Sequence, residues 1–208
     1  MHEIIGSIIA RSEHDLQQRV GKIKEAVDGI QLDVMDGVFV EHQSLDFELP
    51  DHICENCFIE AHLMMYSPMK WIKRYRNFCD MFIVHRETVD NEVLDEIIEY
   101  VRDHNKQIGI ALSPDTPIET IMKYVKSVDV ILVLTVYPGK YGAEFVDKTL
   151  EKIKLLRGQS EIAIEVDGHI DEQTLPKVRE AGVTRFCFGS HLQYSSNVKA
   201  YVHKLRLL

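Results

Sequence analysis

Three side chains that can bind a metal ion or move a proton lie in or directly after short apolar runs. They are Asp33, His62 and Asp167. An acid or an imidazole buried in such a run lowers the stability of the folded protein unless it is paired. Three such residues that meet in one place therefore indicate a functional site. Two carboxylates and an imidazole suit a divalent ion such as Zn²⁺, Fe²⁺ or Mn²⁺. Two carboxylates on opposite sides of a substrate can also act as base and acid beside a carbonyl, which predicts racemisation or epimerisation.

Several later runs end in glycine-containing segments. Pro138-Gly-Lys-Tyr-Gly142 follows one run, Asp167-Gly168 ends another, and Phe188-Gly189-Ser190 ends the last. Glycine lets backbone N–H groups approach an anion closely, and the last two strand-to-helix loops are the usual phosphate position of a (β/α)8 barrel. The sequence therefore predicts a phosphorylated substrate. Further polar candidates that fall on or at the ends of apolar runs are Ser7, Gln31 and His85.

The elements that must position these residues form an alternation. Segments between the apolar runs carry apolar residues at three- and four-residue spacing, for example Leu94, Ile97 and Val101, which predicts amphipathic helices. Thr116 followed by Pro117 predicts the start of one such helix. Eight runs rich in Ile, Val, Leu and Phe predict strands at residues 4–9, 29–34, 58–63, 81–84, 107–112, 128–135, 162–166 and 184–188.

Eight strands that alternate with helices fit a (β/α)8 barrel or a doubly wound open sheet. A dinucleotide-binding open sheet needs a GxGxxG motif after its first strand, but Ala10-Arg-Ser12 stands there without glycine. The composition does not shift along the chain, and no linker divides it. We therefore predict one α/β domain over residues 1–208, a (β/α)8 TIM barrel. Catalytic groups of this fold lie at the carboxyl ends of several strands, where the candidates fall.

The composition argues against several classes of partner. Lys and Arg number 24 against 33 Asp and Glu, a formal net charge of −9 with no basic cluster, so we expect neither nucleic acid nor an anionic membrane as a partner. The apolar runs are far shorter than the ~20 residues of a membrane span. The N-terminal segment shows no secretory pattern, which predicts a cytoplasmic protein. Cys54 and Cys57 form a lone CxxC, for which we expect reduced thiols.

Motifs along most of the chain resemble those of one family. The most specific are Leu32-Asp-Val-Met-Asp-Gly-Val-Phe-Val40 and Ile164-Glu-Val-Asp-Gly168. Further motifs occur in the family's order: Ser7-Ile-Ile9, Ala61-His-Leu-Met64, Val84-His-Arg-Glu87, Gly109-Ile-Ala-Leu-Ser-Pro-Asp-Thr-Pro117 and Val136-Tyr-Pro-Gly139. The chain resembles the ribulose-phosphate 3-epimerases, together with the related allulose-6-phosphate 3-epimerases.

This resemblance implies an enzyme that interconverts a phosphorylated ketose and its C3 epimer through an enediolate. The implied substrates are D-ribulose 5-phosphate and D-xylulose 5-phosphate, with a ketohexose 6-phosphate as the alternative. The implied cofactor is a divalent ion of Zn, Fe, Mn or Co. The resemblance also implies a homo-oligomer, either a dimer or a hexamer.

The resemblance assigns roles to individual residues. Asp33 and Asp167 match the two acid/base residues, which are also metal ligands, and His62 matches a third ligand. His85 either hydrogen-bonds the substrate or caps its strand. Met35 and Met64 match apolar residues that line the site. The residues that match substrate and phosphate contacts are Ser7, Gly139, Gly142, Gly168, Gly189 and Ser190.

The sequence also departs from the family pattern. Gln31 stands where the family has a histidine ligand, and a neutral amide oxygen binds Zn²⁺ or Fe²⁺ more weakly than imidazole does. We therefore predict that Gln31 is the fourth metal ligand and that the site binds its metal ion less tightly than a site with histidine at this position. Lys140, Tyr141 and His169 replace other residues of the phosphate loops. Lys140 and His169 offer a positive charge or donors in place of backbone contacts to phosphate.

Two interpretations of these departures compete. In one, the enzyme acts on another sugar phosphate, and in the other the chain is a noncatalytic sugar-phosphate binder. The presence of both aspartates and of His62 favours the enzyme. Decarboxylases and aldolases of the orotidine-phosphate and hexulose-phosphate type share the barrel but require a lysine motif on the third strand. The corresponding segment here, Glu60-Ala-His-Leu-Met-Met65, contains no lysine.

Overall fold

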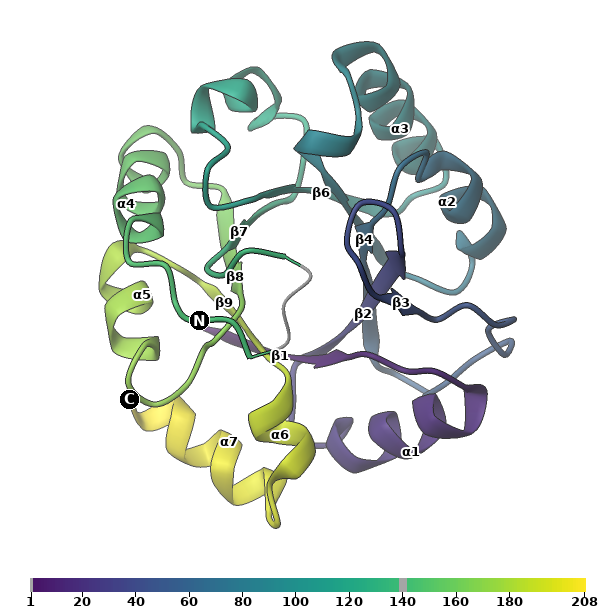
Figure 1. Ribbon diagram of the computed structural model, residues 1–208, viewed down its shortest axis with the longest axis vertical. Helices are drawn as coiled ribbons and strands as arrows, with labels where there is room; N and C mark the ends of the chain where they lie inside the picture. Colours follow the sequence, from purple (N-terminus) through teal and green to yellow (C-terminus); the bar gives the residue numbers. More distant parts are fainter. Residues whose placement is uncertain (1, 139–141) are drawn as a thin grey trace.

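The strands of the computed structural model form a closed ring (Figure 1). The structure describes residues 2–138 and 142–208. Within these ranges eight parallel strands pair in sequence, and β1 pairs with both β2 and β9, which closes the sheet. The predicted (β/α)8 barrel is confirmed, because an open doubly wound sheet would keep two unpaired edges. The strands are β1 (Glu3–Ile8), β2 (Gly29–Asp36), β4 (Phe58–Met64), β5 (Met81–His85), β6 (Gln107–Leu112), β7 (Val130–Leu134), β8 (Ala163–Asp167) and β9 (Arg185–Phe188).

Helices surround this ring on its outside (Figure 1). In α3 (Asn91–Asp103), Asp90 caps the first turn by accepting a hydrogen bond from the N–H of Val93, and Leu94, Ile97 and Val101 are buried. None of the helices in the described ranges has both the length and the apolar character that a membrane span requires. The other α-helices are α1 (Glu13–Ile23), α2 (Met69–Tyr75), α4 (Thr149–Gln159), α5 (Leu175–Ala181), α6 (Ser190–Tyr194) and α7 (Val198–Leu207), and a 3-10 turn, η1 (Arg86–Thr88), follows β5.

Two elements differ from the sequence prediction. The helix expected after Thr116 is replaced by two short 3-10 turns, η2 (Ile118–Thr120) and η3 (Met122–Tyr124). No side chain of the described residues caps η2, and the Thr116 hydroxyl donates a hydrogen bond to Glu87. The second difference is β3 (Gln43–Ser44), which pairs antiparallel with the end of β2. Two residues are too few to show a periodic pattern in the sequence.

The expectation of reduced thiols in the CxxC segment is wrong. Cys54 and Cys57 form a disulfide in the segment that leads into β4. The turn between them brings the two cysteines together, because Asn56 adopts a left-handed backbone conformation with φ of 57°. Cys79 and Cys187 are buried, and neither is bonded to another cysteine that the structure describes.

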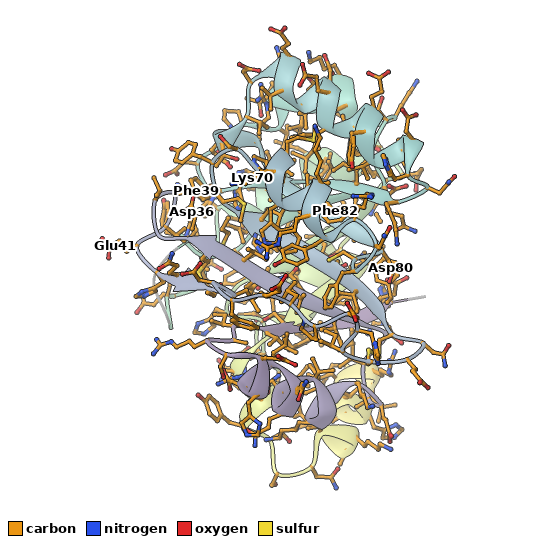
Figure 2. All side chains as sticks on the ribbon, turned by 90° about the vertical axis from the view of Figure 1, so that its right-hand side faces the viewer. Asp36, Phe39, Glu41, Lys70, Asp80 and Phe82 are labelled. Carbon is orange, nitrogen blue, oxygen red and sulfur yellow. A yellow bond between two sulfur atoms is a disulfide. The ribbon has the colours of Figure 1, made fainter. Side chains whose placement is uncertain are left out.

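The two ends of the barrel carry different loops. In Figure 2, Asp36 and Phe39 lie at the end where β2 finishes, and Asp80, which precedes β5, lies at the opposite end. Asp36 connects two loops at its end of the barrel, because its carboxylate accepts hydrogen bonds from the backbone N–H groups of Phe39 and Tyr66. The loop after β2 is thereby attached to the loop after β4.

The barrel interior contains an ionic cluster near the amino ends of its strands. Arg185, the first residue of β9, donates from Nε to Glu165 Oε2 at 2.6 Å and also pairs with Glu60 and Glu3. We call these four residues the Arg185 cluster. Glu60 and Glu165 have side chains with 0% exposure, so the guanidinium provides their compensating charge. Apolar side chains fill the neighbouring layer of the interior: Met81, Ile83, Ala111, Val130, Leu132 and Leu134.

Candidate active site

A cavity of about 330 Å³ opens at the carboxyl ends of the strands. Side chains from β1, β2, β4 and β8 line it together with the loops that follow β7, β8 and β9. The predicted site residues that line the cavity are Ser7, Asp33, Met35, His62, Met64, Gly142, Asp167, Gly168, His169, Gly189 and Ser190. The predictions for Gly139, Lys140 and Tyr141 concern residues outside the described ranges.

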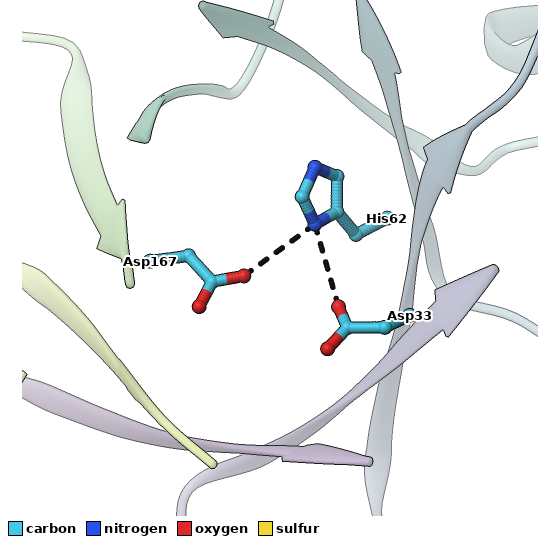
Figure 3. Close-up of side chains that lie close together, drawn as sticks. All are labelled: Asp33, His62 and Asp167. Atoms are coloured by element: carbon cyan, nitrogen blue, oxygen red, sulfur yellow. Dashed lines mark ion pairs between the residues drawn. The ribbon is translucent and has the colours of Figure 1, made fainter. Parts of the chain in front are cut away.

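His62 stands between two carboxylates in this cavity. Its Nδ1 lies 3.4 Å from Asp33 Oδ1 and 3.5 Å from Asp167 Oδ2 (Figure 3). The parallel register of β2 and β4 places Asp33 directly beside His62, and β8 ends at Asp167. Closure of the ring therefore brings together the three side chains that the sequence singled out.

Gln31 lies beneath this group and bridges the two carboxylates. Its Nε2 donates to Asp33 Oδ1 and to Asp167 Oδ2, both at 2.8 Å. Gln31 precedes Asp33 by two residues on the same strand, so both side chains point into the barrel. The Gln31 side chain is buried, and its Oε1 has no hydrogen-bond partner among the described residues.

The donor atoms of this group fit a divalent metal ion. Asp33, His62 and Asp167 each offer one ligand atom, all within 4.8 Å of one another. Tetrahedral ligands about 2.1 Å from an ion are separated by roughly 3.4 Å, and His62 Nδ1 has nearly this distance to both carboxylates. Nδ1 also lacks a hydrogen-bond partner in the part of the chain that the structure describes. Buried polar atoms are rarely left unpaired, so an ion is the natural partner.

The electrostatics of the group favour a positive charge at its centre. Burial and the nearby charge of Asp167 raise the pKa of Asp33 to about 6. Burial disfavours a charged imidazole at His62, but its interactions with Asp167 and Asp33 outweigh this effect and raise the pKa of His62 to about 9. The two buried carboxylates thus favour the positively charged form of His62, and they would favour a metal ion for the same reason.

His85 lies behind His62 and does not line the cavity formed by the described residues. The Nε2 atoms of the two rings are 2.9 Å apart, and His85 Nδ1 is 2.9 Å from Glu87 Oε2. Sequence reasoning missed Glu87 as part of this group. The available signal was its spacing, because Glu87 follows His85 by two residues within a motif shared with the family.

The side of the cavity formed by β8, β9 and the loops that follow them is tightly packed around two glycines. Gly168 has φ of +113°, and a Cβ at this position would lie 2.5 Å from Val136 Cγ2. A Cβ at Gly189 would lie 2.9 Å from Ser7 Oγ. Nδ1 of His169 lies 3.0 Å from the backbone oxygen of Ala143, within hydrogen-bond distance, so this side chain contacts the loop after β7.

Comparison with known sequences identifies the family. Residues 3–193 match the sequence model of the ribulose-phosphate 3 epimerase family. This chain belongs to the ribulose-phosphate 3-epimerase family. The ribulose-phosphate 3-epimerase of Chlamydia pneumoniae is 35% identical over 191 residues, which cover 87% of this chain and 82% of the relative. That of Schizosaccharomyces pombe is 29% identical over 212 residues, which cover 98% and 92%.

Solved structures confirm the barrel. KGPDC from Streptococcus mutans superposes with a TM-score of 0.75 at 13% identity, over 99% of this chain and 96% of that one. A 3-hexulose-6-phosphate synthase gives a TM-score of 0.71 at 16% identity, over 99% and 98%. These likenesses concern the fold alone. Membership of the ribulose-phosphate 3-epimerase family makes the chain an isomerase, and it supports epimerisation of a sugar phosphate.

Proposed function

We propose that this chain catalyses metal-dependent epimerisation at C3 of D-ribulose 5-phosphate and D-xylulose 5-phosphate. The observation that carries the proposal is the pair of carboxylates, Asp33 and Asp167, on two sides of His62 in one cavity. Epimerisation requires a proton to leave one face of a carbon and another to arrive on the opposite face. Two carboxyl groups that approach from β2 and β8 meet this requirement.

The proton steps follow from these two residues. One aspartate, ionised, takes the C3 proton. The electron pair of the C–H bond forms the C2=C3 double bond of an enediolate, while the second bond of the C2 carbonyl breaks and its electron pair moves onto the C2 oxygen. The other aspartate, protonated, returns a proton to the opposite face of C3.

Asp33, His62 and Asp167 would hold the metal ion, of the Zn, Fe, Mn or Co type. When bound, the ion supplies positive charge beside the substrate oxygens, which makes the C3 proton more acidic. Gln31 becomes a fourth ligand if its side-chain amide rotates by half a turn, so that Oε1 takes the place of Nε2 beside both carboxylates. A cytoplasmic location and assembly into a dimer or hexamer stay predictions.

Replacing Gln31 tests the proposed weakness of the metal site. We expect Gln31→His to bind Co²⁺ more tightly by on the order of tenfold, because imidazole is a stronger ligand than an amide oxygen. Gln31→Leu removes both the amide oxygen and the hydrogen bonds to the carboxylates, so it should bind Co²⁺ more weakly than the unmodified chain. Titration followed by visible absorption measures both. A Gln31→His variant that binds no more tightly would argue against a ligand at this position.

Proton NMR of ribulose 5-phosphate in D₂O tests the proposed reaction directly. The chain is first treated with a chelator and then supplied separately with Zn²⁺, Fe²⁺, Mn²⁺ or Co²⁺. We expect deuterium to enter at C3 only with a metal present. The same experiment with a ketohexose 6-phosphate tests the allulose-6-phosphate type of activity. Absence of exchange with both sugars, in a chain that binds metal, would contradict the proposal and indicate a noncatalytic sugar-phosphate binder.

A further inference from the structure

A line of two buried histidines and a partly buried glutamate extends from the cavity into the barrel wall. Glu87 contacts His85, and His85 contacts His62, with 2.9 Å between the atoms of each pair. The side chains of His62 and His85 have 0% exposure, and that of Glu87 has 22%. The two rings are tilted by only 22° with centroids 5.0 Å apart. Because the two Nε2 atoms are much closer together than the ring centres, the rings contact each other through these atoms, and a hydrogen on one Nε2 can be donated to the other.

Glu87 sets the direction of these hydrogen bonds. Its Oε1 accepts from the backbone N–H of Ser113 at 2.8 Å and from the Thr116 hydroxyl. Burial opposes the charge, but the hydrogen bonds from His85, Thr116 and Ser113 outweigh it and lower the pKa of Glu87 to about 2. An ionised carboxylate only accepts hydrogen bonds, so the hydrogen between Glu87 and His85 resides on Nδ1 of His85.

The hydrogen on His85 Nδ1 also fixes the hydrogen between the two rings. A neutral imidazole carries one hydrogen, and in the completely buried ring of His85 this hydrogen lies on Nδ1 toward Glu87, so Nε2 carries a lone pair. Nε2 of His62 must then donate to it. When a metal ion takes the place of the proton that Asp33 and Asp167 otherwise hold on His62, the ring keeps its hydrogen on Nε2 and presents the lone pair of Nδ1, the atom that faces both carboxylates.

We infer that Glu87 and His85 are positioning residues that direct the Nδ1 lone pair of His62 into the cavity, ready to bind a metal ion. This inference rests on the proposed metal-dependent function. Neither residue reaches the cavity lined by the described residues, so they act through His62. Partners of this kind fix the tautomer and ring orientation of a ligating histidine, and their loss typically weakens metal binding by about 10–100-fold.

The variant Glu87→Gln tests the direction of the relay. Its amide carbonyl can keep the hydrogen bonds from Ser113 and Thr116, whereas its NH₂ group would face His85 and donate to Nδ1. Both histidine hydrogens would then reverse, which places a hydrogen on His62 Nδ1. We expect Co²⁺ binding, followed by visible absorption, to weaken by about 10–100-fold. Thr116→Val is the matched control, because it removes a donor to the same carboxylate without reversing the relay, so its Co²⁺ affinity should stay near that of the unmodified chain.

The outcomes separate this inference from the proposed function. Equal Co²⁺ affinity in Glu87→Gln and the unmodified chain, or an equal loss in Thr116→Val, would overturn the relay and leave the metal site intact. An unmodified chain that binds no Co²⁺ would overturn the proposed metal dependence and the relay with it. A second readout needs no variant: ¹⁵N NMR of the Zn²⁺-loaded chain should show hydrogens on His62 Nε2 and His85 Nδ1. The opposite pattern would refute the inference.

Discussion

Replacing Asp33 or Asp167 by asparagine is expected to lower the rate of epimerisation by about 10²–10⁴-fold, because an amide cannot take up or return a proton. In each variant we expect one half of the reaction, exchange of the C3 proton, to survive. The carboxylate that remains can still remove the C3 proton on its own face. Each variant should therefore exchange deuterium into one epimer of the substrate while conversion between the epimers nearly stops. Proton NMR in D₂O measures exchange and conversion in the same sample.

Asp80→Asn provides the control for this experiment. Asp80 is also an aspartate next to a strand, but it lies at the opposite end of the barrel from the loop after β2 (Figure 2). Its replacement should leave kcat close to that of the unmodified chain. Each aspartate variant should first be checked for bound metal, because Asp33 and Asp167 are also proposed ligands. Undiminished turnover in either variant would contradict the two-aspartate mechanism.

Replacing Arg185 by methionine is expected to lower the free energy of unfolding by about 3–5 kcal/mol, because removal of one partner leaves buried charge uncompensated. Glu60 and Glu165 are completely buried, and the guanidinium of Arg185 contacts both of them. Urea unfolding followed by circular dichroism measures this loss. Glu3→Gln is the control, because Glu3 pairs with the same guanidinium but is 47% exposed, and exposed pairs contribute roughly 0–1 kcal/mol.

The pH dependence of this loss identifies its cause. Burial and the charge of Glu165 raise the pKa of Glu60 well above its usual value, whereas Arg185 lowers it. A group whose pKa is raised on folding contributes stability at low pH and loses it as the pH increases. Without Arg185 the pKa of Glu60 rises further, so the stability loss should grow from about pH 5 to pH 8. A loss that does not depend on pH would indicate a packing defect instead.

The strands and the catalytic candidates could be predicted from the sequence for one physical reason. Strands of a parallel barrel are buried on both faces, so they appear as short apolar runs, and a polar residue in such a run is conspicuous. Asp33, His62 and Asp167 stand out in this way, and the structure places them around one point. The motifs that surround them are also local strings of residues, which is why the family resemblance was visible before the fold.

The partners of these residues could not be predicted, because they depend on tertiary structure. Glu87 accepts hydrogen bonds from Ser113 and Thr116, which the pairing of β5 with β6 brings to it. Arg185 meets Glu3 only because β1 pairs with β9. Sequence alone determined which residues are chemically unusual and which segments are strands. Closure of the ring decided which atoms face one another, since hydrogen-bond direction and charge pairing depend on residues far apart in the chain.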